Sequence, residues 1–269
     1  EQGDLVLANA YTLAPVPGAI FNVGGKAVLV EIDQDYHIDI TDLAAKAEAT
    51  DAKYLLLSHM RGHIADMEAI MAIADQHGIC VIEDCAHTMG ARWNGIRSGN
   101  FGHVAAFSTQ TYKHMNSGEG GLLTTNDPLI AAKATIMSGS YMLYERHGAG
   151  PAPEVFEQFR TKMPNFSCRL DHLRAAIIRA QMAHLDNNIA RWNKLYHALD
   201  SGLRSIEGAS LPQRPQQEFY VGSSIQFRVE CLDKGAIPDF LARCARRGVE
   251  LKWFGADRPA AFTSRYDSW

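Results

Sequence analysis

The stretch IADMEAIMAIADQHGICVIED, residues 64–84, joins a helical pattern to a short apolar run. Its first part, which we predict to be a helix over residues 64–77, repeats apolar residues at helical spacing: Ile64, Met67, Ile70, Met71 and Ala74. Gly78 then ends the helix, and residues 80–83 have the near-continuous apolar character of a strand that is covered on both faces. This succession is typical of an α/β domain.

The same alternation extends on both sides of this stretch. Besides residues 80–83, the segments predicted as strands are 5–8, 27–32, 54–58, 105–108 and 122–125, and a further helix is predicted over 43–49. Strands that alternate with helices predict a mostly parallel sheet flanked by helices. The fold class is therefore α/β, with a small α+β domain at the C-terminus.

The alternation of strand and helix patterns ends after the last of these strands. We predict a large domain over residues 1–170, a long connecting helix over 171–200 and a small α+β domain over 201–269. The small domain carries a strand pattern in SSIQFRVE (223–230), a helix in IPDFLARCARRG (237–248) and a strand in VELKWFG (249–255). Both ends of the chain are abrupt, so we expect parts of the large and small domains to lie outside this sequence.

The bulk composition excludes several classes of protein. The 269 residues carry a formal net charge of −4, which favours neither nucleic acid nor an anionic membrane as a partner. No apolar run approaches the length of a membrane span. The five cysteines form no C-x-x-C pair, which predicts reduced thiols and a cytoplasmic protein.

Four residues of different chemistry follow the predicted strands. Asp84 ends one strand and His87 comes three residues later, while Ser108 ends another strand and the loop after it carries Lys113. Ligands of open α/β sheets bind beyond the carboxyl ends of the strands, so these side chains are expected on one rim.

Pyridoxal phosphate needs such a set. Its aldehyde takes a lysine amine, its ring nitrogen takes a carboxylate, and its phosphate takes hydroxyls and backbone amides. From the residues alone, other interpretations stay open: Lys113 as a solvated charge, Asp84 as a helix cap, His87 as a structural histidine and Ser108 as an ordinary strand end. The glycines at 118, 120 and 121 also fit a simple hairpin.

Other site patterns are absent from the sequence or weak. It contains no dinucleotide-binding G-x-G-x-x-G after a strand, no phosphate-binding G-x-x-x-x-G-K-[ST] and no G-x-S-x-G elbow. His59 and His63 are spaced for metal binding from one helix face, but Gly62 lies between them at a strand-to-loop transition. We predict no metal site.

Three segments together resemble the DegT/DnrJ/EryC1/StrS family of sugar aminotransferases: VIEDCAHTMGARWNG (81–95), FGHVAAFSTQTYK (101–113) and GEGGLLTTND (118–127). The resemblance implies the aspartate aminotransferase fold, known as fold type I, and pyridoxal phosphate as cofactor. It also implies transfer of an amino group from glutamate or glutamine to a nucleotide-linked keto-sugar or a keto-cyclitol, in a homodimer.

Carried over by position, the resemblance makes Lys113 the Schiff-base lysine and Asp84 the partner of the pyridinium nitrogen. His87 is implied to lie near the ring, and Ser108 to contact the phosphate. The family places a further phosphate loop upstream of the first strand here, and an aromatic near Leu13, for which Tyr11 is a substitute. Ser167, with Asn165 nearby, stands where the family often has an asparagine that reaches a neighbouring subunit.

Two rival functions remain. Some relatives are deoxysugar dehydratases that replace the lysine with histidine, and His114 follows Lys113 here. A non-catalytic member that acts as a binding or regulatory module is the other alternative, supported by the changes at Leu13 and Ser167.

Overall fold

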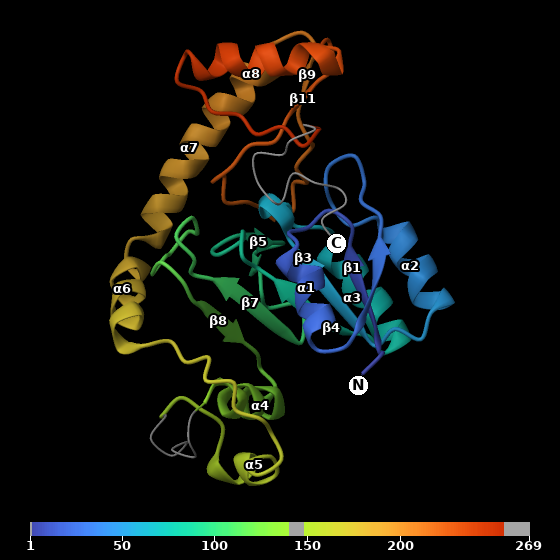
Figure 1. The fold of residues 1–269 in the computed structure, drawn as a ribbon, viewed down its shortest axis with the longest axis vertical. Helices are drawn as coiled ribbons and strands as arrows, with labels where there is room; N and C mark the ends of the chain where they lie inside the picture. Colours follow the sequence, from blue (N-terminus) through green and yellow to red (C-terminus); the bar gives the residue numbers. More distant parts are fainter. Residues whose placement is uncertain (1, 140–147, 256–269) are drawn as a thin grey trace.

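The computed structural model describes residues 2–139 and 148–255, and its centre is a six-stranded sheet of order β2-β1-β3-β4-β7-β8 (Figure 1). Neighbours are parallel from β2 to β7, and β8 runs antiparallel to β7. The strands are β1 Leu5–Asn9, β2 Lys26–Val30, β3 Tyr54–Ser58, β4 Cys80–Asp84, β7 Val104–Ser108 and β8 Gly121–Thr124. The predicted α/β class and mostly parallel sheet are confirmed.

Helices and short strands complete the described fold. The helices are α1 Pro15–Asn22, α2 Ile40–Ala49, α3 Met67–His77, α4 Pro128–Ser138, α5 Pro153–Glu157, α6 His172–Met182, α7 Leu185–Arg204 and α8 Ile237–Ala245, with 3-10 turns η1 Met60–Gly62 and η3 Lys234–Ala236. The short strands are β5 Arg92–Trp93, β6 Ile96–Arg97, β9 Ala209–Ser210, β10 Glu218–Phe219 and β11 Arg228–Val229. None of the helices in the described ranges has the length and apolar character needed to cross a membrane.

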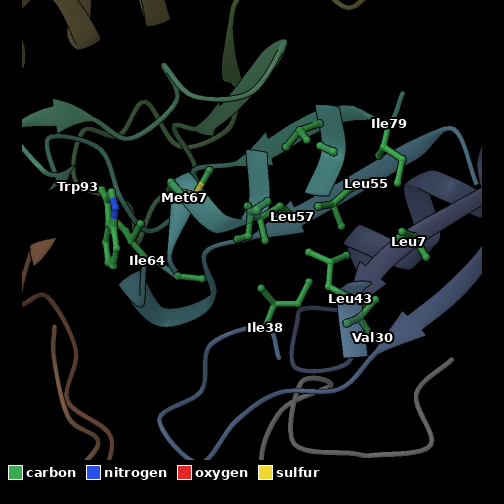
Figure 2. Packing of buried hydrophobic residues seen from close by; sticks show 14 of the residues in the cluster. Leu7, Val30, Ile38, Leu43, Leu55, Leu57, Ile64, Met67, Ile79 and Trp93 are labelled. Atoms are coloured by element: carbon green, nitrogen blue, oxygen red, sulfur yellow. The ribbon is translucent and has the colours of Figure 1, made fainter. Parts of the chain in front are cut away.

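The core covers the central strands on both faces. Leu7, Leu55 and Leu57 pack with Leu43 of α2 and Met67 of α3 on one face (Figure 2). On the other face the alternate residues of β1, Val6 and Ala8, pack with Ile20 of α1. Because successive strand residues point to opposite faces, continuous apolar runs are required here, as the sequence predicts.

Local capping sets the bounds of α3 more tightly than the apolar pattern did. The helix begins at Met67 rather than Ile64, because Asp66 caps it by accepting a hydrogen bond from the Ala69 N–H at 3.0 Å. It ends at Gly78, as predicted, and the φ of 65° at this glycine is that of a left-handed C-cap. The direct passage from Gly78 into β4 fixes where Asp84 emerges.

The predicted single helix over 171–200 is wrong. It consists of two helices, α6 and α7, separated by a tight turn at Ala183 and His184. Each helix has its own anchor: Gln181 of α6 bonds the backbone of Asn116, while Ile189 of α7 packs against Gly90. The two helices thus contact different loops of the large domain.

The C-terminal strands are the other correction. Of the predicted strand 223–230 only Arg228–Val229 pairs, with β9, and residues 249–255 form no strand. The Val249 N–H instead bonds the Cys244 carbonyl at the end of α8, so the segment begins as a helix cap. The helix with Pro238 in its first turn is confirmed as α8. The domain boundaries at 170 and 200 stay predictions.

Candidate active site

Four parallel strands end in polar residues at the same edge of the sheet: Asn9, Ser58, Asp84 and Ser108. The side chain of Asn9 fastens the first two strands by donating to the Ser58 carbonyl and accepting from the Ser58 N–H, both at 2.9 Å. In register, Ser58 lies opposite Asp84. The carboxyl edge of the sheet is thus a hydrogen-bonded rim.

Asp84 is held on this rim by two donors. The Ser58 hydroxyl donates to Oδ2 at 2.9 Å, and the Ala86 N–H donates to Oδ1 at 3.0 Å. These bonds use the carboxylate as an acceptor and fix its orientation. Asp84 therefore does not cap a helix, which was the alternative left open from the sequence.

The loop that presents Lys113 is closed by backbone hydrogen bonds. The Thr109 N–H donates to the Gly120 carbonyl and the Thr111 N–H to the Gly118 carbonyl, each at 2.9 Å. Gly118 and Gly120 have φ values of 85° and 134°, which side chains rarely adopt. A Cβ on Gly120 would also lie 2.8 Å from the Thr109 hydroxyl, so the loop requires this glycine.

The amine of Lys113 meets His87. Lys113 Nζ lies 3.2 Å from His87 Nε2, and both side chains are half-buried. Burial lowers the pKa of His87 to about 3, with help from the charges of Lys113 and Arg61, so the ring is neutral at pH 7. A neutral ring nitrogen accepts a hydrogen bond from an ammonium group, so Nε2 of His87 is the acceptor and Nζ of Lys113 the donor.

The surroundings of Lys113 set the pKa of its amine. Burial lowers the pKa of the amine, the charge of Arg61 lowers it further, and the carboxylate of Asp84 opposes both. A lowered pKa increases the fraction of neutral amine, which is the nucleophilic form. Lys113 is thus no ordinary solvated lysine.

The structure brings Asp84, His87 and Lys113 together, while Ser108 lies further along the rim. Ala106, not Ser108, is opposite Asp84, and Ser108 is half-buried at the end of β7. Its hydroxyl accepts a 3.3 Å hydrogen bond from the Gln110 N–H. The place of Ser108 suits contact with a different part of a ligand from that held by the other three, and the roles of all four residues stay predictions.

The side chain of His114 makes contacts with other segments of the fold. Its Nε2 lies 2.9 Å from the Ser223 hydroxyl, and its ring packs 5.3 Å from that of Trp192. Burial lowers its pKa to about 4. These contacts tie the lysine loop to α7 and to the C-terminal segment.

Sequence reasoning assigned no role to Ser58 and Arg61. Ser58 carried the same signal as Asp84, because it is a polar residue at a strand end. Arg61 lies in the turn directly after β3, and its charge lowers the pKa values of Lys113, His87 and Tyr11. In the sequence, Arg61 is visible only as a cation inside HMRGH, a segment whose histidine spacing directs attention to metal binding.

The two histidines of HMRGH have different partners. His59 Nε2 lies 3.2 Å from Glu83, and His63 Nε2 lies 2.9 Å from Gln226. His59 and Glu83 do lie with Cys85 in one buried group of ligand atoms. Glu83 is already saturated, however, because it also accepts from the N–H groups of Gly99, Phe101 and Gly102. We interpret the group as a hydrogen-bond network that closes residues 99–102 onto β4.

Comparison with known proteins identifies a family model that matches most of the chain. The model of the DegT/DnrJ/EryC1/StrS aminotransferase family matches residues 1–257. Among curated relatives, a pleiotropic regulatory protein of Geobacillus stearothermophilus is 35% identical over 71% of this chain and 47% of its own length. The dTDP-3-amino-3,4,6-trideoxy-alpha-D-glucose transaminase of Streptomyces venezuelae is 33% identical over 78% of this chain and 52% of its own length.

A solved structure gives the same result for the fold. The crystal structure of S. venezuelae DesV in complex with a ketimine intermediate superposes with a TM-score of 0.78 at 30% identity, over 96% of this chain and 64% of that chain. The chain spans about half the length of the curated relatives it matches.

Proposed function

Because the chain belongs to the DegT/DnrJ/EryC1/StrS aminotransferase family, we propose that it is a pyridoxal-phosphate-dependent aminotransferase that acts on a keto-sugar or a keto-cyclitol. The observation that carries the proposal is the contact of Lys113 with His87 beside Asp84. The three side chains supply an amine, a neutral ring and a carboxylate within one rim.

The donor set fits the cofactor. Lys113 would hold the aldehyde carbon, Asp84 the ring nitrogen and Ser108 the phosphate, with His87 beside the ring. When bound, pyridoxal phosphate supplies an aldehyde that condenses with amines and a ring that accepts electrons. The pairs of hydrogen bonds that orient Asp84 keep its carboxylate as an acceptor, which is the form that a protonated ring nitrogen requires.

The chain's own residues then handle the proton. Once a substrate amine replaces it, the Lys113 amine would be free, and its Nζ would take the α-proton of the donor and return a proton to the aldehyde-derived carbon on the other side of the nitrogen. The lowered pKa of Lys113 suits both steps, since the base works best when its pKa approaches the working pH. The contact with His87 Nε2 holds the Lys113 amine beside the His87 ring.

The substrate class is proposed from the relatives. One of them is named a dTDP-amino-sugar transaminase and another a GDP-perosamine synthase, which supports a nucleotide-linked keto-sugar as acceptor. A third is named 3-amino-5-hydroxybenzoate synthase, which supports a cyclic acceptor without a nucleotide. Glutamate or glutamine is the proposed amino donor.

A homodimer is proposed as the working form. The edge strand β8 leaves Leu122 and Leu123 exposed, and α6 leaves Leu173 and Ile177 exposed. Large exposed apolar side chains mark interaction surfaces. Light scattering should give twice the mass of the chain, and Leu123→Asp with Leu173→Asp should give a monomer. A cytoplasmic location, which agrees with cysteines that form no disulfide, stays a prediction.

A regulatory protein is the second candidate function. A relative with 35% identity is named a pleiotropic regulatory protein, and another a sensory transduction protein. Such a protein needs no reactive amine, so the lowered pKa of Lys113 favours the enzyme.

The deciding experiment measures transfer itself. Full-length protein loaded with pyridoxal phosphate is given glutamate or glutamine and a panel of nucleotide keto-sugars, and the amino-sugar product is measured. Lys113→Ala should abolish product, while Lys194→Ala, which removes an exposed lysine of α7, should not. A protein that binds the cofactor and turns over no donor is the regulatory candidate instead.

A further inference from the structure

Arg61 occupies a place on the rim that the proposed cofactor contacts leave unused. It lies in the 3-10 turn Met60–Gly62, three residues after Ser58 ends β3. The turn is tied to the site on both sides. The His59 N–H donates to the Asp84 carbonyl at 3.1 Å, and a Cβ on Gly62 would lie 3.1 Å from the His87 carbonyl.

The backbone of Arg61 is unusual for its residue type. Its φ of 56° and ψ of 18° lie in the left-handed region, which costs energy for a side chain with a Cβ. Its neighbours Met60 and Gly62 are buried, whereas Arg61 is half-exposed. Strained residues of this kind persist where the surrounding structure holds them and gather at ligand sites.

The Arg61 guanidinium has no acidic partner among the residues that the structure describes. Within residues 2–139 and 148–255, no carboxylate lies at ion-pair distance from Arg61, in contrast to Arg214, which pairs with Glu218 at 2.8 Å. Arg61 interacts with Tyr11, whose pKa is raised by burial and lowered in part by the charge and hydrogen bond of Arg61. A half-buried arginine without a carboxylate retains donors for a ligand.

The described groups around Arg61 do not neutralise its positive charge. Burial keeps His63, His87 and His114 neutral by lowering their pKa values to about 3, 3 and 4. The carboxylate of Asp84 already receives two hydrogen bonds and acts on Lys113. Among the described residues, the positive charge of Arg61 therefore acts on Lys113 without an ion-pairing carboxylate of its own.

We propose that Arg61 binds an oxyanion, either a carboxylate or a phosphate, of the small molecule whose reacting group reaches Lys113. A guanidinium suits this task, because its planar fork binds both oxyanions through two parallel hydrogen bonds. The proposal deepens the proposed function and rests on it, since Lys113 is taken as the reacting amine. It makes Arg61 a residue that selects substrate and is separate from the four cofactor contacts.

Calorimetric titration of the full-length protein tests the proposal with two probes. Glutarate represents the carboxylates of an amino donor, and UDP represents the diphosphate of a nucleotide-linked acceptor. Arg61→Gln should weaken one probe about tenfold or more, as expected when a charged hydrogen-bonding partner is lost. Arg61→Lys should weaken it less, and the control Arg97→Gln, on an exposed side chain of β6, should leave both probes within about twofold.

The outcomes separate the sources and the two proposals. Weakening of glutarate alone assigns Arg61 to the donor carboxylate, and weakening of UDP alone assigns it to the acceptor phosphate. Wild-type protein that binds neither probe, or Arg61→Gln that binds both as wild type does, overturns the proposal. Melting temperatures show which variants fold. If Arg61→Gln does not fold, the titrations are made with Arg61→Lys instead. If pyridoxal phosphate does not attach to Lys113 while Arg61→Gln still weakens a probe, the proposed function fails and anion binding by Arg61 stands.

Discussion

Gly90 offers a sharp test of how α7 supports the His87 loop. Its φ is 92°, and an added Cβ would overlap the Cδ1 methyl of Ile189, which is buried in α7. The next contacts of that Cβ, with Ile189 Cγ1 at 3.7 Å and Leu185 Cδ2 at 3.9 Å, are ordinary. One methyl group therefore creates the steric conflict in Gly90→Ala.

The magnitude follows from two costs. Overpacking costs about 1–3 kcal/mol, and a Cβ at this φ costs roughly 1 kcal/mol more, so Gly90→Ala should destabilise the protein by about 2–4 kcal/mol. Ile189→Val deletes the overlapping methyl and alone costs about 0.5–1.5 kcal/mol. The double variant should then be more stable than the two single costs predict, by about 1–3 kcal/mol.

Thermal and urea unfolding of the wild type, both single variants and the double variant measure this coupling. Pyridoxal phosphate affinity measured on the same four proteins should fall in Gly90→Ala and recover in the double variant, because His87 lies three residues from Gly90. Strictly additive costs, or a Gly90→Ala variant as stable as the wild type, refute the packing of α7 on this loop.

Three further predictions concern the rim. Ser58→Ala should cost about 1–2 kcal/mol in chemical denaturation and weaken pyridoxal phosphate binding, because Asp84 loses the 2.9 Å hydrogen bond from the hydroxyl; unchanged stability and affinity contradict it. Burial lowers the pKa of His63 from 6.5 to about 3, so below pH 6.5 the unfolded chain binds a proton that the folded chain does not. Stability should therefore fall through this window as pH drops, by about 1.4 kcal/mol per pH unit for this residue, and His63→Gln should flatten the unfolding free energy measured against pH; an unchanged slope contradicts it. Arg61→Gly relieves the left-handed strain and should raise the unfolding free energy by about 1 kcal/mol while anion binding falls; a less stable variant contradicts the strain.

The sequence was sufficient for the inner strands of the large sheet because their burial is two-sided. In β1 and β3 both faces pack against apolar residues, so the strands are almost entirely apolar, and the bounds of β3 were predicted to the residue. Asp84 and Ser108 were found by the same logic, since a strand that leaves the core ends in a polar residue. The glycines at 118 and 120 were expected to allow a tight turn, and their positive φ values agree.

Contacts between distant segments limited the rest. The helices on the two sides of the break make separate contacts, Gln181 with Asn116 and Ile189 with Gly90, and neither contact can be inferred from helical periodicity. The strand predicted over 249–255 alternates correctly but has no neighbour to pair with in the described chain. The position of Arg61 near Asp84 was not predicted, because it depends on β3 ending beside β4, which is a property of the strand order.

The central claim is that the amine of Lys113 reacts with the aldehyde of pyridoxal phosphate. Borohydride reduction of the loaded full-length protein, followed by proteolysis and mass spectrometry, locates the attached cofactor directly. The account predicts that the label lies on the peptide that contains Lys113 and is absent from Lys113→Ala. A label on another lysine, or no label on protein that binds the cofactor, would contradict it.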